Sequence, residues 1–142
     1  MTARAALVLS ALALLGGCAG TAGAGSTAAC RRAGGGEMVK AELLFGRDVA
    51  GRAPVSDAEW ERFVAEEVTP RFPDGLTVFA ATGQWRDRAT AAVVREPSFV
   101  VQIVAPASAE ADTRLAAIRS AYRQRFNQQS VGLVLTSVCA AF

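Results

Sequence analysis

The polar and aromatic residues of this chain that could form a functional site are of types that bind ligands rather than catalyse reactions. Arg71, Trp85 and Arg86 could line a cleft for an anionic or planar ligand, because guanidinium groups form bidentate hydrogen bonds and an indole ring stacks on flat groups. Tyr122 could donate a proton in the same space, although its position on an apolar helical stripe is typical of a core residue. The simpler interpretation of residues 69–75 is a helix end followed by a turn that leads into a strand.

The sequence lacks the side chains of the common catalytic machineries. It contains no histidine, which excludes imidazole acid–base catalysis and histidine metal sites. No nucleophile elbow, phosphate-binding loop or dinucleotide fingerprint occurs after residue 17. We therefore predict no catalytic residue, no metal site and no cofactor. The formal net charge of +2 gives no reason to expect nucleic acid as a partner.

The first eighteen residues predict export and attachment to a membrane. Arg4 precedes an apolar run from Ala5 to Gly17, and Cys18 follows small residues. The pattern resembles a bacterial lipoprotein signal, in which the cysteine is acylated and becomes the first residue of the mature protein. The run is shorter than the roughly 20 residues of a membrane span, and ordinary secretion is the alternative. We expect a lipid on Cys18 and a place in the bacterial cell envelope, facing the periplasm or the cell exterior.

Composition divides the chain into a signal at 1–17, a lipidated cysteine with a tether at 18–36, and a single domain at 37–142. The tether is rich in Ala and Gly and cannot bury enough apolar surface to offset its ordering entropy, so we predict that it is flexible. With Cys18 lipidated, Cys30 and Cys139 remain, and outside the cytoplasm such a pair favours a disulfide. The alternatives are a free Cys30 in the tether and an inert, buried Cys139.

Hydrophobic periodicity in the domain predicts strand, helix, strand, strand, helix, strand. Ser56 and Glu59 have the spacing of a capping box, and Pro97 suggests a bulge or break before the third strand. The order is that of the ferredoxin-like split βαβ fold (βαββαβ), an α+β fold with a four-stranded antiparallel sheet and two helices on one face. The expected strands are 37–47, 76–80 with a possible extension to 85, 99–104 and 131–135, and the expected helices are 57–68 and 112–126.

The face of this sheet away from the helices is too apolar to be left in water. We expect a second copy to cover it in a homodimer, with a ligand or a C-terminal segment as the other occupants. Glu42 and Gln102 could orient a small ligand there, although both also fit as solvated strand residues. The residues on this face are Lys40, Glu42, Leu44, Thr77, Phe79, Val100, Gln102, Val104 and Val134.

Several sequence blocks carry a family resemblance. The domain resembles an uncharacterised bacterial family, domain of unknown function 3574, over residues 37–142. The resemblance implies an exported location and a fold, and it implies no activity. The blocks are Glu42–Gly46, Val55–Trp60, Thr69–Val78, Gly83–Arg86 and Gln129–Val131.

Two functions from different classes fit these observations. The first is a noncatalytic envelope lipoprotein that binds a small molecule or another envelope protein through the second sheet face or the region of Arg71 and Trp85. The second is a small cofactor-independent enzyme that resembles the dimeric ferredoxin-like monooxygenases. The enzyme requires a closed pocket that holds a carboxylate or phenol of perturbed pKa.

Overall fold

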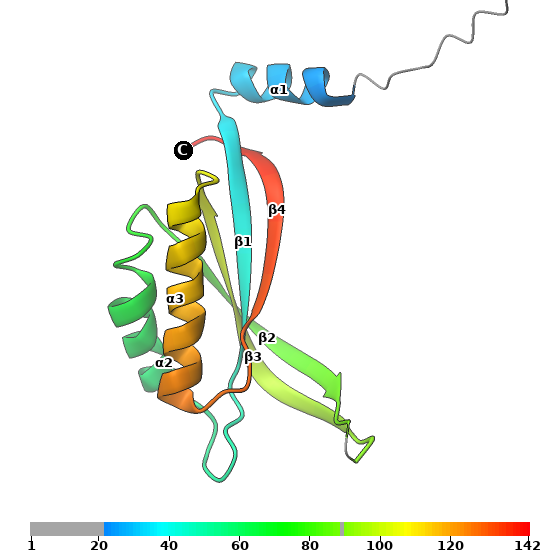
Figure 1. The fold of residues 1–142 in the computed structure, drawn as a ribbon, viewed down its shortest axis with the longest axis vertical. Helices are drawn as coiled ribbons and strands as arrows, with labels where there is room; N and C mark the ends of the chain where they lie inside the picture. The colour runs from blue at the N-terminus through cyan, green and yellow to red at the C-terminus, as the bar shows by residue number, and fades with distance from the viewer. Residues whose placement is uncertain (1–21, 89) are drawn as a thin grey trace, which may run out of the picture.

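The computed structural model describes residues 22–88 and 90–142. The predicted signal and Cys18 lie outside the described residues. The elements follow the order predicted for the domain, with one additional helix before it (Figure 1). They are α1 (Ala22–Arg32), β1 (Gly36–Gly46), α2 (Asp57–Phe63), the π-helical turn η1 (Val64–Val68), β2 (Thr77–Arg86), β3 (Val93–Ala105), α3 (Ala109–Phe126) and β4 (Gly132–Ala140).

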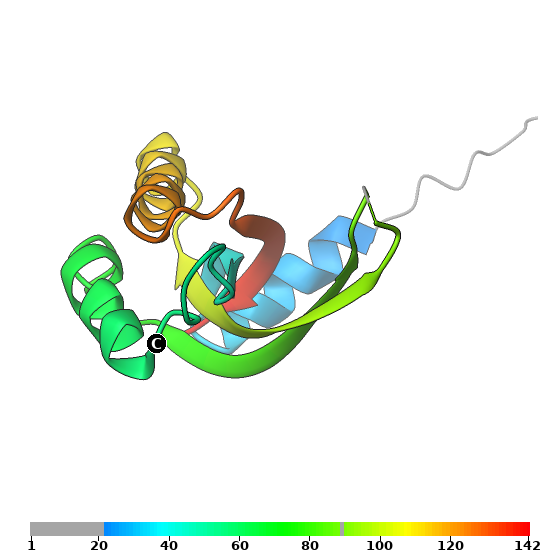
Figure 2. The same cartoon turned by 90° about the horizontal axis from the view of Figure 1, so that it is seen from below.

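The four strands form one antiparallel sheet in the order β2-β3-β1-β4. Helices α2 and α3 lie side by side against one face (Figures 1 and 2). This arrangement confirms the predicted α+β class and agrees with the ferredoxin-like split βαβ topology. We call the face that α2 and α3 leave uncovered the open face.

The hydrophobic core lies between the sheet and the two helices. Phe45 of β1 is at its centre, with ring centroids 5.1 Å from Trp60 and 4.7 Å from Tyr122, both in edge-on geometry. Such aromatic pairs contribute about 0.5–1.5 kcal/mol beyond the area they bury. Leu43 and Val101 are fully buried beside them, as the alternating pattern predicts for the helix-facing side of the sheet.

Strand β3 is longer than predicted, and the break expected at Pro97 does not occur. Pro97 pairs with Thr82 of β2, and its carbonyl accepts a hydrogen bond from the N–H of Arg47 at 3.0 Å. Because the nitrogen and the carbonyl of one strand residue point to the same side, the nitrogen of Pro97 faces the side on which β1 has ended at Gly46. Proline therefore costs no ladder hydrogen bond there, and the strand continues through it.

The ends of β2 and β3 extend beyond the rest of the sheet as a two-stranded arm. The last pair between β1 and β3 is Gly46 with Ser98, whereas β2 and β3 continue to pair from Thr82–Pro97 to Arg86–Val93. We call residues 82–97 the hairpin arm. It curves away from α2 and α3 toward the side of the open face (Figure 2).

The predicted flexible tether was wrong for much of its length, because residues 22–32 form helix α1. Alanine has the highest helix propensity, and a covalent bond fixes the helix to the domain. Cys30 is buried and forms a disulfide with Cys139 of β4, with 5.7 Å between their Cα atoms. The structure thus confirms the predicted pairing and shows that it fastens α1 to the end of the sheet (Figure 1).

We predict that Cys139→Ser lowers the free energy of unfolding by about 2–4 kcal/mol, because the disulfide restricts the unfolded chain over a separation of 109 residues. Urea unfolding followed by tryptophan fluorescence measures the change, with Ala29→Ser on the exposed side of α1 as the control. Hydrogen exchange should also show α1 losing protection in Cys139→Ser. Equal stability and equal protection of α1 in both variants would contradict the structural role of the disulfide.

Candidate functional site

A hollow of about 850 Å³ lies on the open face, at the point where the hairpin arm leaves the sheet. Its floor is formed by Leu44 of β1 and Val100 of β3, which face each other across the ladder. The hairpin arm contributes Trp85 and Val94, a second facing pair. The loops at 48–54 and 127–130 form the remaining rim. Four strands and two loops thus meet around one concave surface.

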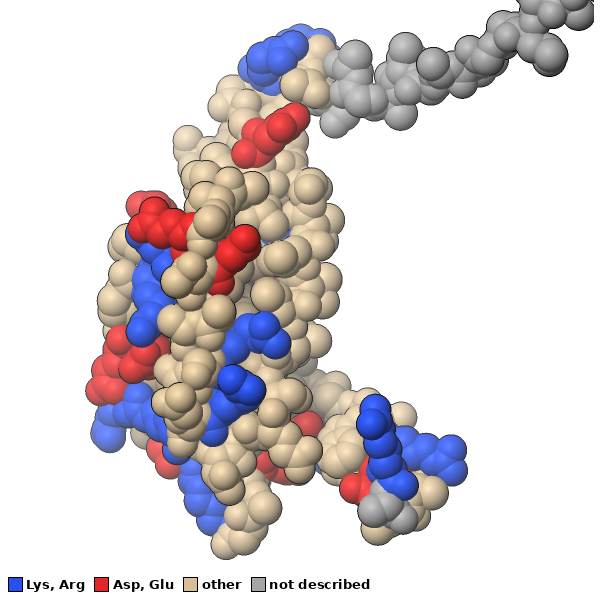
Figure 3. All heavy atoms as spheres, viewed as in Figure 1, with Lys and Arg blue, Asp and Glu red and all other residues tan. Residues whose placement is uncertain are grey.

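Large apolar side chains remain exposed on and around this floor. Leu44 is 44% exposed, Phe79 48% and Trp85 47%. Charged side chains gather over the helices and on the hairpin arm, whereas uncharged atoms prevail over the side of the sheet where β4 lies (Figure 3). Exposed apolar surface bordered by polar groups is typical of a binding site. The structure therefore agrees with the expectation that the second sheet face is too apolar for water.

Glu96 of β3 is one of the two carboxylates in the described lining of the hollow. It is half-buried, and its Oε2 accepts a hydrogen bond from the N–H of Asp48 at 3.4 Å. Two glycines make room for this part of the site. A Cβ atom on Gly46 would lie 2.7 Å from Oε2 of Glu96, and one on Gly83 would lie 2.9 Å from Oγ of Ser98. Because Gly46 of β1 and Gly83 of β2 have no side chains, the Glu96 carboxylate and Ser98 fit between these two strands.

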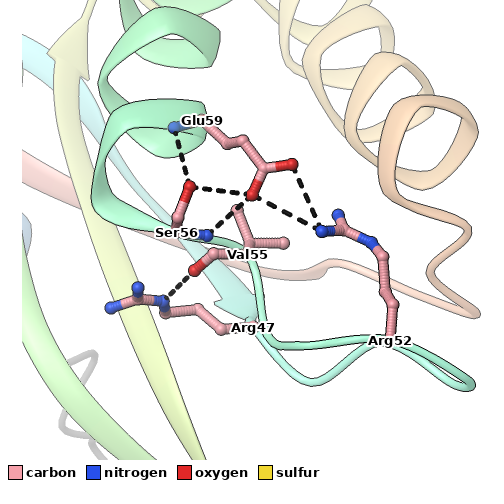
Figure 4. A network of polar contacts seen from close by, with 5 residues as sticks. All are labelled: Arg47, Arg52, Val55, Ser56 and Glu59. Atoms are coloured by element: carbon pink, nitrogen blue, oxygen red, sulfur yellow. Dashed lines mark hydrogen bonds and ion pairs between the residues drawn. The ribbon is translucent and has the colours of Figure 1, made fainter.

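A network at the start of α2 holds the loop that forms one wall of the hollow (Figure 4). The Glu59 carboxylate accepts hydrogen bonds from the N–H of Ser56 at 2.8 Å and its hydroxyl at 2.9 Å, and Arg52 donates to it at 3.2 Å. These contacts, led by the Ser56 N–H, lower the pKa of Glu59 below its ordinary value. Arg47 donates to the carbonyl of Val55 at 2.7 Å. The predicted capping box is confirmed, and it also fixes the wall.

The two rim loops are joined directly. The side-chain amide of Gln128 donates to the backbone carbonyl of Asp48 at 2.6 Å. The loop before α2 and the loop before β4 therefore meet at the edge of the hollow. The same amide N–H cannot serve a ligand without breaking this bond.

Tyr122, a predicted proton donor, is a core residue that supports the site from behind. Its ring packs against Phe45 and Phe63, and its hydroxyl donates to the carbonyl of Gly46 at 2.9 Å. Burial raises the pKa of Tyr122 above its ordinary value. The phenol is not among the residues that line the hollow. It holds the end of β1 in place from the helix side of the sheet.

The other predicted binding residues do not converge on one cleft. Arg71 pairs with Glu67 of η1 at 2.8 Å, in the helical layer. Arg86 donates to the carbonyl of Ala91 at 3.1 Å, near the tip of the hairpin arm. Trp85 lines the hollow and neither arginine does. The prediction that Arg71, Trp85 and Arg86 share a cleft was wrong, because the arginines point along their own segments to local acceptors.

Glu42 and Gln102 lie opposite each other on the open face, as the register requires. Glu42 forms an ion pair with Lys40 at 3.4 Å, and neither Glu42 nor Gln102 lines the hollow. The sequence interpretation missed Glu96 and Ser98, which lie further along the same face of β3. The signal that could have found them was Gly83, a residue without a side chain in a strand, opposite Glu96.

Among the described residues, no group of three or more His, Cys, Asp or Glu side chains could hold a metal ion. Within the same residues, no helix is long and apolar enough to cross a membrane.

Comparisons with known proteins identify a family and a fold. A family model described as "Protein of unknown function (DUF3574)" matches residues 40–142. No curated protein matches the sequence. A phage SAM lyase in complex with S-methyl-5′-thioadenosine is similar in structure, with a TM-score of 0.56 and 18% identity over 72% of this chain and 90% of that chain. The same comparison with a phage SAM lyase in the apo state gives a TM-score of 0.52 and 22% identity over 77% and 93% of the two chains.

The Bacillus subtilis GlnK–ATP complex is more distant, with a TM-score of 0.45 and 12% identity over 72% of this chain and 82% of that chain. At these identities the likeness to the lyase structures shows a shared fold alone.

We predict that Tyr122→Phe lowers the free energy of unfolding by about 1–2 kcal/mol, because the carbonyl of Gly46 loses its donor inside the protein. The effect should depend on pH. The folded state keeps the phenol protonated beyond its ordinary pKa of about 10, so the unfolded state loses that proton first and wild-type stability falls as pH rises above about 10. In Tyr122→Phe, the free energy of unfolding should not show this contribution to the decrease above about pH 10.

The chain has one tyrosine, so absorbance at 295 nm reports Tyr122 alone. Phenolate should form in the folded protein only at a pH well above that of the urea-unfolded protein. Ionisation of folded Tyr122 at the same pH as in urea would contradict its burial and its hydrogen bond.

Proposed function

The chain belongs to the family described as protein of unknown function (DUF3574), and we propose that it is a noncatalytic binding module of the bacterial cell envelope. A lipid on Cys18 attaches it to a membrane, and the hollow on the open face takes a small molecule. The sequence supports the proposed location, and the geometry of the hollow supports the proposed binding.

The disulfide and the position of α1 support the proposed location in the cell envelope. A disulfide such as Cys30–Cys139, which joins residues 109 positions apart, is typical of proteins that fold outside the reducing cytoplasm. Helix α1 begins at Ala22, and the residues between Cys18 and Ala22 are too few to hold the domain far from a membrane. Because Cys30 in α1 is bonded to Cys139, the lipid would restrain the domain through a short, covalently fixed connection.

The observation that carries the mode of action is the hollow itself. It combines an apolar floor with polar side chains on its rim, and exposed apolar surface that polar residues border marks ligand-binding grooves. Its shape depends on the hairpin arm, on the pinned loop before α2 and on space kept by Gly46 and Gly83. Such construction is hard to explain as a by-product of folding, because the core lies on the other face of the sheet.

The enzyme alternative finds less support. It asks for a buried acid or phenol of perturbed pKa inside a closed pocket. The buried phenol is that of Tyr122, and its hydroxyl is already bonded to the carbonyl of Gly46, outside the lining of the hollow. Binding therefore accounts for the geometry with fewer additional assumptions.

Native mass spectrometry of the full-length protein, purified from bacterial membranes in detergent, tests both parts of the proposal. We predict a mature chain that starts at Cys18 and carries the mass of acyl groups, and a further noncovalent small molecule. Cys18→Ala should lose the acyl mass and the membrane fraction, whereas Cys30→Ser should keep both. A chain that stays equally membrane-bound without Cys18 would contradict the anchor.

In the same spectra, a matched pair of variants locates the small molecule. Ala81→Phe places a ring in the hollow, whereas Ala80→Phe places one on the opposite face of the same strand. The bound mass should disappear from Ala81→Phe and remain in Ala80→Phe. Loss from neither variant, or a doubled protein mass without a small molecule, would contradict the proposal. The doubled mass would support the homodimer in its place.

A further inference from the structure

We infer that the hollow selects a small organic cation, whose positive group the Glu96 carboxylate holds while its apolar body stacks on Trp85. The inference rests on the proposed binding function and names the class of its ligand.

Register places the two recognition groups within reach of one molecule. Glu96 is opposite Gly83, and Trp85 is opposite Val94, on the same face of the β2–β3 pair. They are diagonal neighbours, for which Cα atoms are typically about 7–8 Å apart. Because Gly83 has no side chain, β2 leaves the approach to the carboxylate uncovered. A ligand of modest size can therefore contact the indole ring and the carboxylate together.

The charges around the hollow favour a cation. Two carboxylates, those of Glu96 and Asp48, belong to its described lining, and Arg52 is the single cationic residue there. Arg52 donates to Glu59 at 3.2 Å, outside the hollow. The carboxylates of the described lining therefore outnumber its cations, and its one cation is paired with a carboxylate outside the hollow.

The nearby guanidinium of Arg47 is also committed elsewhere. It forms an ion pair with Asp57 at 2.9 Å, and its central carbon lies 4.9 Å from the ring centroid of Phe99. An anionic ligand would meet two carboxylates and one guanidinium, that of Arg52, which is already paired with Glu59. A cation meets a carboxylate and the electron-rich face of an exposed indole, the two partners that organic cations favour.

Three probes with similar aromatic bodies and different charges test the inference: phenethylammonium, 2-phenylethanol and 3-phenylpropanoate. The full-length lipidated protein is placed in zwitterionic nanodiscs, and the indole N–H signals of its two tryptophans are followed by NMR, with empty nanodiscs correcting for partition into lipid. Trp85 is 47% exposed and should respond, whereas the 4% exposed Trp60 serves as the internal reference. We expect phenethylammonium to bind about tenfold more tightly than the alcohol, and the carboxylate probe to bind most weakly.

Glu96→Gln keeps the size of the side chain and its ability to accept from the N–H of Asp48, and it removes the charge. It should weaken phenethylammonium about tenfold and leave 2-phenylethanol unchanged. Glu42→Gln is the matched control, because Glu42 lies on the same face and outside the hollow. It should change neither probe.

The outcomes separate this inference from the function on which it rests. Equal affinity for the three probes, tighter binding of the carboxylate probe, or an unchanged response to phenethylammonium in Glu96→Gln would overturn the cation class while leaving the hollow as a binding site. Failure of all three probes to shift the Trp85 signal would also overturn the inference. The bound mass and its loss in Ala81→Phe would then still decide the binding function.

Discussion

The structure depends on the point at which β1 stops. Tyr122 donates from α3 to the carbonyl of Gly46 and holds the last residue of β1 on the core, while β2 and β3 continue to pair beyond it. The two strands that lose their neighbour become the hairpin arm. Pro97 is tolerated because its nitrogen faces the side that β1 has left, and the arm and the strand ends enclose the hollow. The hydrogen bond from Tyr122 to Gly46 thus connects the core on the helix side of the sheet to the hollow on the open face.

Stability and function are divided between the two faces of the sheet. The aromatic core around Phe45 and the cap at Ser56 serve the helix side, and the disulfide fastens α1 to the far end of β4. The open face keeps exposed apolar side chains that contribute little to this stability. Because the open face contributes little to folding, its side chains are free to bind a ligand. A lipid anchor near α1 would hold this face close to a membrane.

The sequence predicted the order of elements because apolar periodicity records which face of each element is buried, as at Phe45 and Val101. The capping box followed from spacing alone. Helix α1 could not be predicted from composition, because its glycines favour a flexible chain and the disulfide that holds it to the sheet depends on the fold. The site was found only at Trp85. In the sequence, Glu96 is an ordinary charged residue beside a proline. Its place in the hollow depends on the β2–β3 register and on Gly46 and Gly83, which are distant from it in sequence.

The central claim is that the open face is occupied when the protein is in its own membrane, and hydroxyl-radical footprinting tests it directly. The lipidated protein in native membranes is compared with the same protein after purification and removal of bound molecules. The account predicts that Trp85 and Leu44 are oxidised more slowly in the native membrane, while Phe142, which is 98% exposed, is oxidised equally in both. Equal oxidation of Trp85 and Leu44 in the two samples would contradict it.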